Sequence, residues 1–389
     1  MTVSPSARVR AATAALVLWA TALHAQVPVP RTSLERTIAF PEPFSQVRGL
    51  RELPTGIVLV TDWTEERLVA LDFSRGTVVA IGRVGGGPRE FRLPAQLLPY
   101  TGDSTLLVDV GNERFAVVGP DLVLHRTLPA RAGSRRYPIT PRGADAVGRL
   151  YFGIPPWALG PEAPPGDSVD IARWDPRTDE MRILARLKGA ERPSWQKEGR
   201  PRMTPGIPMV AFAPQDAWAI APDGRIAIVR AGDYHVEWRD PDGTLRRGPS
   251  YAYAPLVVTE SDKRAFVVAF TQSSPMSGRG EGGGLGHTPA EFLSPESIAR
   301  DIRTNEFAER HPYFRAGGAW IGPDGVLWVE RSVNAGAAPV VDVFDGAGRL
   351  VRQVMLPAGR RLVGVGRDGP YAVVADADGL ETLERYRVD

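Results

Sequence analysis

Cysteine is absent from the 389 residues of this sequence. Its absence excludes disulfide bonds, thiolate metal sites, a cysteine nucleophile and a lipid anchor on an N-terminal cysteine. Histidine is scarce, with five in the chain, so a histidine-rich zinc site is poorly supported. No P-loop, GxSxG or HExxH motif occurs. The fold must therefore be held by burial of apolar side chains, and no common catalytic motif indicates an activity.

Lysine is nearly absent, and neither sign of charge is in excess. Lys188, Lys197 and Lys263 are the only lysines, and 47 Lys and Arg face 45 Asp and Glu. Removal of Arg8 and Arg10 with an N-terminal leader would leave 45 charges of each sign. A neutral chain argues against general binding to nucleic acid or to a membrane surface, because both require a concentrated basic face.

Long apolar runs are lacking, except for one near the N-terminus. Arg8 and Arg10 precede an apolar run from Ala11 to Leu23, and residues 23–25 have the form of a cleavage site. The run is shorter than the roughly 20 residues that cross a bilayer, although a membrane anchor stays open as the alternative. We expect residues 1–25 to be a signal peptide, the protein to be exported to the periplasm or the extracellular space, and residues 26–389 to form one domain without a transmembrane segment.

Glycine and proline are abundant, with 41 and 36 residues, which indicates many tight turns. Between the turns, short runs rich in β-branched residues recur in units of about 40 to 50 residues, as in the blades of a β-propeller. Six units can be laid out. Their runs are 46–53, 57–60, 68–71 and 77–81; 105–108, 115–118 and 123–128; 150–152, 168–174 and 181–187; 217–221, 225–229, 235–239 and a strand near Tyr251; 319–321, 326–329, 340–344 and 350–356; and 362–365, 371–374 and 382–388.

The sixth unit is one strand short, and a strand without a blade precedes the first unit. Residues 34–40 alternate between apolar and polar side chains. Pairing this strand with the last unit would satisfy an open sheet edge and close the ring. The sequence therefore predicts an all-β fold, a single six-bladed β-propeller closed by its N-terminal strand.

Residues 255–315 interrupt the repeats and carry helix signals. Residues 259–262 resemble a capping box before a helix over 263–272, and Ser294-Pro295 starts a second helix over 297–310. The apolar side of each helix is expected to pack on the propeller. We predict a two-helix insertion between blades 4 and 5, with the Gly-rich segment 277–287 either a hinge for a lid or disordered.

The first two units resemble NHL-type six-bladed propellers. Residues 108–115 (Val-Asp-Val-Gly-Asn-Glu-Arg-Phe) match the Asp, Asn and Arg pattern of that repeat, and residues 81–94 match its Gly-rich link. Residues 311–314 and 322–329 are similar to exported bacterial six-bladed propellers of unassigned role. The resemblance implies the fold and no single activity. From spacing alone, Asp109 and Arg114 are expected to pair across a turn.

The topology of a blade sorts its loops between two faces of the disc. Turns after the first and third strands lie on one face, and links after the second and fourth strands lie on the other. The first set is short, whereas the second includes residues 155–167, 188–214 and 255–315. Long loops in compact domains commonly carry function, so we expect the site on this long-loop face.

Aromatic and polar side chains near the long-loop face are the candidates for ligand binding. Aromatic rings stack on sugars or peptides, although packing beneath the loops is the alternative. The candidates are Trp63, Asn112, Trp157, Tyr234, Glu330, Arg331 and Asp376. Arg131, Arg135, Arg136 and Arg142 cluster in one link and could pair with a carboxylate or phosphate, or form a solvated charge run.

A metal site is a second possibility. Propeller lactonases resembling senescence marker protein hold a hard divalent ion through carboxylate and Asn ligands, which implies calcium as the metal here. The corresponding candidates are Glu330, Asn334, Asp376 and Asp378. No other cofactor is expected.

Three functions remain open. The first is an exported, non-enzymatic binding module for a protein, peptide or glycan, which the loop distribution favours. The second is a metal-dependent hydrolase, lactonase or lyase with its ligands at the channel mouth. The third is a scaffold for an envelope assembly.

Overall fold

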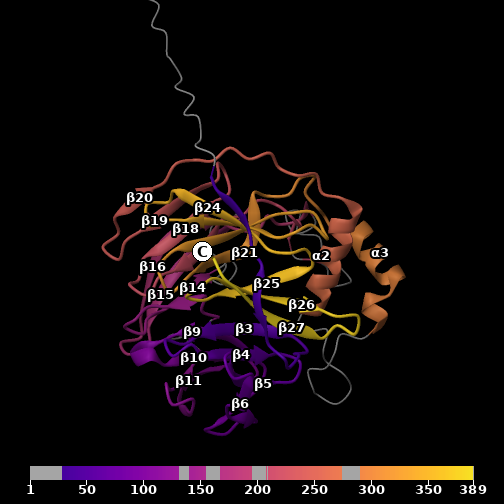
Figure 1. The fold of residues 1–389 in the computed structure, drawn as a ribbon. Helices are drawn as coiled ribbons and strands as arrows, with labels where there is room; N and C mark the ends of the chain where they lie inside the picture. The colour runs from indigo at the N-terminus through magenta and orange to yellow at the C-terminus, as the bar shows by residue number, and fades with distance from the viewer. Residues whose placement is uncertain are drawn as a thin grey trace, which may run out of the picture.

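The computed structural model describes residues 29–130, 140–154, 167–194, 207, 209–273 and 290–388. Six antiparallel sheets are arranged about a central axis, so the chain forms a six-bladed β-propeller, as the repeats predicted (Figure 1). The expected signal peptide, the Gly-rich segment 277–287, Trp157 and the arginines at 131, 135 and 136 lie outside the described residues. No helix of the described part is long and apolar enough to cross a membrane.

Each blade is built outward from an innermost strand. The first three blades, in chain order, are β3 (Val47–Glu52), β4 (Val58–Asp62), β5 (Arg67–Asp72) and β6 (Thr77–Ala80); β9 (Pro94–Pro99), β10 (Thr105–Asp109), β11 (Arg114–Val118) and β12 (Leu124–Pro129); and β13 (Gly143–Ala144), β14 (Leu150–Ile154), β15 (Ser168–Asp175) and β16 (Glu180–Lys188).

The other three blades follow the same plan, and two short segments lie in a link. Blade 4 is β17 (Ala217–Ile220), β18 (Ile226–Arg230), β19 (His235–Arg239) and β20 (Leu245–Arg247). Blade 5 is β21 (Phe314–Ile321), β22 (Leu327–Arg331), β23 (Val340–Phe344) and β24 (Leu350–Met355), and blade 6 contains β25 (Arg360–Val365), β26 (Pro370–Ala375) and β27 (Glu381–Tyr386). The strands β7 (Arg83–Val84) and β8 (Glu90–Phe91) pair between blades 1 and 2, and the 3-10 turn η1 (Thr101–Asp103) follows β9.

The core lies between the blades. One cluster of buried apolar side chains fills each of the six interfaces between neighbouring blades, including the interface between the last blade and the first. The innermost strands contact one another in cyclic order, β3, β9, β13, β17, β21, β25 and again β3. Apolar burial at about 25 cal/mol per Å² therefore stabilises a closed ring, which a chain without cysteine requires.

The N-terminal segment closes the ring, as predicted, but in two parts. β2 (Arg36–Ala39) is the outer strand of blade 6 and pairs with β27, whereas β1 (Arg31–Ser33) pairs in parallel with β24 of blade 5. Leu34 and Phe40 are buried on either side of β2. The segment therefore joins blade 5 to blade 6 as well as joining the two ends of the chain.

The predicted difference between the two faces is present. The turn after β17 is typical of the short face, since Gly224 in Pro222-Asp223-Gly224 has a φ of +86° that favours glycine. The links after second and fourth strands include residues 81–93, 189–216 and 248–313. In the described part of the chain, the long segments between strands therefore lie on the long-loop face.

The insertion between blades 4 and 5 contains the two expected helices. α2 (Glu260–Ser273) begins close to its predicted start. α3 (Pro295–Thr304), which follows the 3-10 turn η4 (Ala290–Leu293), is capped by Ser294, whose Oγ accepts a hydrogen bond from the Ser297 N–H. The prediction that this helix reaches residue 310 was wrong, because the chain turns at Asn305 and Phe307 pairs with Ala211 instead.

The insertion is tied to the propeller through Asp262. This buried carboxylate accepts hydrogen bonds from Thr259, Asn334 Nδ2 and the Ala335 N–H, and lies 3.2 Å from His311 Nε2. Burial alone would raise the pKa of Asp262, but these hydrogen bonds hold it well below its usual range. Both helices therefore rest on a charged anchor at blade 5.

Candidate functional site

Four arginines stand at the starts of innermost strands, and two of them, Arg48 and Arg142, line the axial channel. Innermost strands run from the long-loop face to the short-turn face, so residues at their starts surround the long-loop mouth. Arg48, Arg315 and Arg361 are each the second residue of β3, β21 and β25, and Arg142 directly precedes β13. We call these four residues the arginine collar. It draws on blades 1, 3, 5 and 6.

Arg361 and Arg315 each bond a glutamate, and the charge of Arg361 acts on Arg48. Arg361 donates to Glu381 at 2.5 Å, and Arg315 lies 3.3 Å from Glu330. Burial lowers the pKa of Arg48, and the positive charge of Arg361 lowers it further. The collar thus contains four cations, and Glu330 and Glu381 are the carboxylates bonded to it by these contacts.

Arg142 occupies the most unusual position. In the described part of the chain, its guanidinium donates only to carbonyl oxygens, those of Trp218 at 2.9 Å and Gly317 at 2.7 Å. Burial lowers the pKa of Arg142, and no carboxylate among the described residues offsets that effect. A guanidinium held by carbonyl groups keeps its full positive charge and a fixed orientation, which suits a carboxylate, sulfate or phosphate.

Glu330 is a carboxyl group at this mouth whose pKa is raised. Its side chain on β22 is 10% exposed. Burial raises the pKa of Glu330, and the charges of Arg315 and Arg361 act against that rise. Protonation of this one carboxyl would therefore increase the positive charge of the mouth.

Trp63 is, with Glu330, a sequence candidate that the structure brings to the collar. Its indole ring lies beneath Arg48, with the guanidinium carbon 5.0 Å from the ring centroid. A cation over an indole is attracted by the negative ring face. Trp63 therefore orients Arg48 at the edge of the mouth.

Other sequence candidates lie in structural networks. Asn112 Nδ2 donates to Gly85 O and to Asp109, which also pairs with Arg114 at 2.8 Å, as spacing predicted. The Tyr234 ring is fully buried and bonds Asp342, the carboxylate that also accepts from Arg331 Nε. Neither Tyr234 nor Asn112 is placed to meet a ligand entering the mouth.

The four metal candidates do not converge. Asn334 bonds Asp262, and Glu330 faces Arg315. Asp376 and Asp378 share one hairpin turn, in which the Asp376 carboxylate accepts from the backbone of Asp378 and Leu380. Across the described ranges, no group of three or more His, Asp or Glu side chains is arranged to hold a metal ion.

Sequence reasoning missed most of the collar. The sequence points to Arg142 only within a cluster of four arginines that either pairs with a carboxylate or phosphate or forms a solvated charge run, and it does not single out Arg48, Arg315 and Arg361. Their shared signal is position, because all four stand at the start of an innermost strand. The first strands of several units were poorly defined in sequence, so this alignment was not visible there.

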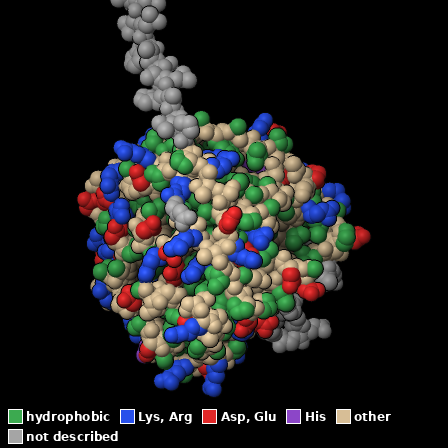
Figure 2. Space-filling view, in the orientation of Figure 1, with side chains coloured by type: hydrophobic (Ala, Val, Ile, Leu, Met, Phe, Trp, Pro, Cys, Tyr) green, Lys and Arg blue, Asp and Glu red, His purple; other side chains and the backbone are tan. Residues whose placement is uncertain are grey.

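The surface outside the mouth shows no comparable concentration of charge in the view of Figure 2. Basic and acidic side chains are interspersed over the visible face. This mixture agrees with the near-neutral composition of the chain. The collar is therefore a local feature.

Comparisons with known proteins assign neither a family nor an activity to this chain. No protein-family model and no curated protein matches the sequence. Among solved structures, the chain is similar to a gluconolactonase from Xanthomonas campestris (13% identity, 92% of this chain and 96% of that one, TM-score 0.43). It is also similar to a calcium-binding regucalcin from Agrobacterium tumefaciens (13%, 93% and 97%, TM-score 0.40) and to a DUF4221 family member from Bacteroides vulgatus (9%, 92% and 98%, TM-score 0.48).

Proposed function

We propose that this protein is an exported, non-enzymatic binding module that takes an acidic ligand at the long-loop mouth of its channel. The observation that carries the proposal is Arg142, a half-buried cation oriented by two carbonyl groups and bonded to no carboxylate in the described part of the chain. Arg315 supports it, since its side chain remains 55% exposed beside Glu330. Export is supported by the leader-like pattern of residues 1–25.

The binding chemistry follows from the guanidinium group. Its planar set of N–H donors matches two oxygens of a carboxylate or sulfate, and such charge-assisted bonds are the strong ones. At a mouth bounded by apolar walls, the attraction is screened less than on an open surface. The neutral exterior would not attract polyanions in general, so selectivity for an acidic group would come from the collar.

The test uses inorganic sulfate as the probe. Sulfate at millimolar concentration should raise the melting temperature of the purified protein saturably, beyond sodium chloride of equal ionic strength. R142Q should lose the effect, because one charge-assisted hydrogen bond is worth about 1.5 to 3 kcal/mol, or ten- to a hundredfold in Kd. R182Q, at an exposed arginine on the outer strand β16, is the matched control and should respond like the wild type.

The proposal fails if sulfate gives no more stabilisation than chloride. It also fails if R142Q and R182Q respond alike while both retain the melting temperature of the wild type without sulfate. A circular dichroism spectrum of each variant checks that the propeller is intact.

A further inference from the structure

The channel behind the collar is a cavity with a volume of about 590 Å³. Residues from the innermost strands of all six blades line it, from Arg48 and Arg142 at the long-loop mouth to Pro54 and Arg367 at the short-turn end. This size lies within the range of about 300 to 1,000 Å³ that holds small organic ligands. The cavity is therefore large enough for more than the anionic group at the collar.

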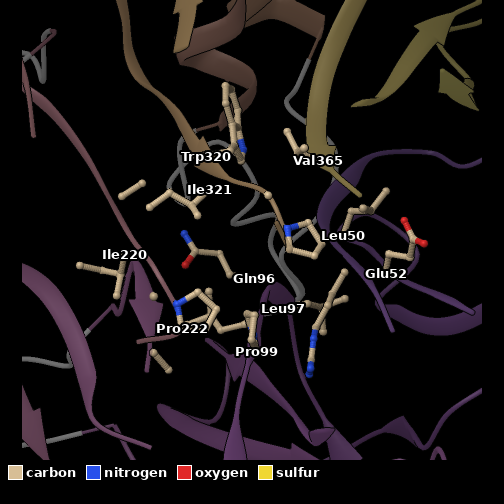
Figure 3. Close-up of a pocket in the computed structure, with 18 of the residues that line it drawn as sticks. Leu50, Glu52, Gln96, Leu97, Pro99, Ile220, Pro222, Trp320, Ile321 and Val365 are labelled. Atoms are coloured by element: carbon tan, nitrogen blue, oxygen red, sulfur yellow. The ribbon is translucent and has the colours of Figure 1, made fainter. Parts of the chain in front are cut away.

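Beyond the collar, apolar side chains form the middle of the channel wall, whereas Arg51, Glu52, Asp103, Asp145 and Arg367 line it toward the short-turn end. Figure 3 shows side chains from different blades meeting around the same space, among them Leu50, Ile220, Trp320, Ile321 and Val365. All five are only half-buried, because part of each side chain faces the channel. A wall of this kind favours an apolar body over a polyhydroxylated one, since hydroxyl groups placed against it would lose hydrogen bonds.

Gln96 places a polar side chain in this apolar middle section. Its side chain projects from β9 into the cavity (Figure 3). The Oε1 atom is buried without a hydrogen-bond partner in the described part of the chain. Buried amide oxygens are nearly always bonded, so a turn of the Gln96 amide toward the cavity would let Oε1 accept a hydrogen bond from a ligand O–H or N–H.

Gln96 lies close to the collar along the channel axis. A Cβ placed on Gly49 would lie 2.4 Å from Ala95 O and 3.0 Å from Leu97 N, so β3 and β9 approach closely there. Gly49 directly follows Arg48, which puts Gln96 about one residue deeper than that collar arginine. At roughly 3.3 Å per residue, a donor bonded to Gln96 would stand only a few atoms from an acid group at the collar.

We infer that the ligand is a small amphiphilic carboxylic acid with a hydrogen-bond donor next to its carboxylate, held tail-first in the channel. The inference rests on the proposed anion-binding function and adds the class of ligand. The carboxylate stays at the arginine collar, the adjacent donor bonds Gln96, and the apolar tail lies against Leu50, Ile220 and Ile321. A peptide C-terminus entering the channel would instead carry its carboxylate past the collar into the apolar section, which disfavours that ligand.

The first experiment measures binding by isothermal titration calorimetry with acetate, octanoate and 1-octanol. Each buried methylene contributes about fourfold in affinity, from 0.8 kcal/mol per group, so octanoate should bind at least about a hundredfold more tightly than acetate. Neutral 1-octanol should bind far more weakly than octanoate. I220E places a carboxylate in the apolar wall and should abolish the advantage of octanoate while sulfate still binds. L245E, at an exposed leucine on the outer strand β20, is the matched control.

The second experiment addresses Gln96. Racemic 2-hydroxyoctanoate should bind about tenfold more tightly than octanoate to the wild type, since its hydroxyl group can donate to Gln96 Oε1. Q96L should remove that preference and leave octanoate bound at least as tightly. Q96L adds no charge and keeps a similar side-chain volume. It therefore still tests binding in the channel if I220E fails to fold.

The outcomes separate the two claims. If sulfate binds through Arg142 but octanoate binds no more tightly than acetate, the amphiphilic ligand is ruled out and the binding module stands. If the preference for 2-hydroxyoctanoate is missing or survives in Q96L, the assignment to Gln96 is wrong. If no anion binds at all, the proposed function itself fails.

Discussion

Two arginines of this propeller, Arg114 in blade 2 and Arg142 at the channel mouth, have the same chemistry and different surroundings. Arg114 pairs with the fully buried Asp109 and also donates to carbonyl oxygens of Gly86, Gly87 and Glu90. Arg142 donates to two carbonyl oxygens and, in the described part of the chain, to no carboxylate. The first arrangement is complete within the protein, whereas the second keeps an unneutralised charge. Framework substitutions should therefore cost stability, and collar substitutions should cost anion binding.

The closure of the ring is the framework feature with the largest expected effect. Deleting residues 32–40 removes β2 and the buried side chains of Leu34 and Phe40, and each such side chain is worth about 1.5 to 3 kcal/mol. With the lost strand pairing, the cost should exceed about 5 kcal/mol, the lower end of typical domain stability. No cooperative thermal transition should remain. R31A, which removes only hydrogen bonds to Gln353, should melt nearly as the wild type. A deletion variant with normal melting would contradict the closure.

Asp109 tests the completed network itself. D109A removes the carboxylate that pairs with Arg114. The same change leaves the Arg92 N–H and the Asn112 amide without their hydrogen-bond acceptor. Breaking a buried pair from one side costs about 3 to 5 kcal/mol, measured by urea denaturation. D121A, at an exposed aspartate of the same blade that contacts His125, should change stability by less than about 0.5 kcal/mol. Folded D109A should bind sulfate normally. If D109A lost sulfate binding but kept its stability, the assignment of Asp109 to the framework would be wrong.

Asp262 should give a smaller and pH-dependent effect. Its pKa is depressed in the folded protein, so its contribution is present above the unfolded value of about 3.9 and is lost as the pH falls toward the folded value. D262N should cost about 1 to 3 kcal/mol at neutral pH and flatten the acid limb of the stability curve. Hydrogen exchange at α2 and urea unfolding from pH 7 to 3 would show both. E260Q, at an exposed glutamate of the same helix, is the control. If the stability of D262N fell with acid pH as in the wild type, Asp262 would not be the anchor of the insertion.

Substitution of Glu330 should change stability least. In contrast to a collar substitution, it should strengthen anion binding. Because burial raises its folded pKa, its stabilising contribution is full below the unfolded value of about 4.3 and falls as the pH rises through the folded value. E330Q should therefore be as stable as the wild type at pH 7, or slightly more. Sulfate should bind the wild type more tightly at pH 5 than at pH 7, and E330Q tightly at both. Equal pH dependence in the two proteins would exclude Glu330 as the group responsible.

The sequence was sufficient for the architecture because blade repeats are local patterns. Alternating runs and tight turns recur within each unit, and the missing last strand pointed to residues 34–40. What failed depended on neighbours far away in the chain. The fourth strand of blade 4 was expected near Tyr251 and lies at Leu245–Arg247; the Tyr251 hydroxyl instead accepts a hydrogen bond from Leu350 N–H of the next blade.

The site was harder to predict for the same physical reason. Tyr234 and Asn112 stand in links on the expected face, yet their partners, Asp342 for one and Gly85 for the other, come from other blades or links. The collar arginines are separated by up to 313 residues, from Arg48 to Arg361. Only ring closure brings them together, so spacing within one unit carries no signal of the site.

Closure by β2 also sets the order in which this molecule can fold. The ion pair between Arg36 and Glu384 spans 348 residues, so one of the first strands to leave the ribosome has no partner until nearly the whole chain has followed. Contacts of such long range form slowly because loop closure must come first. An unpaired strand edge is also prone to association with other chains during that interval. The seam between blades 6 and 1 is therefore where we expect folding to finish and aggregation to begin.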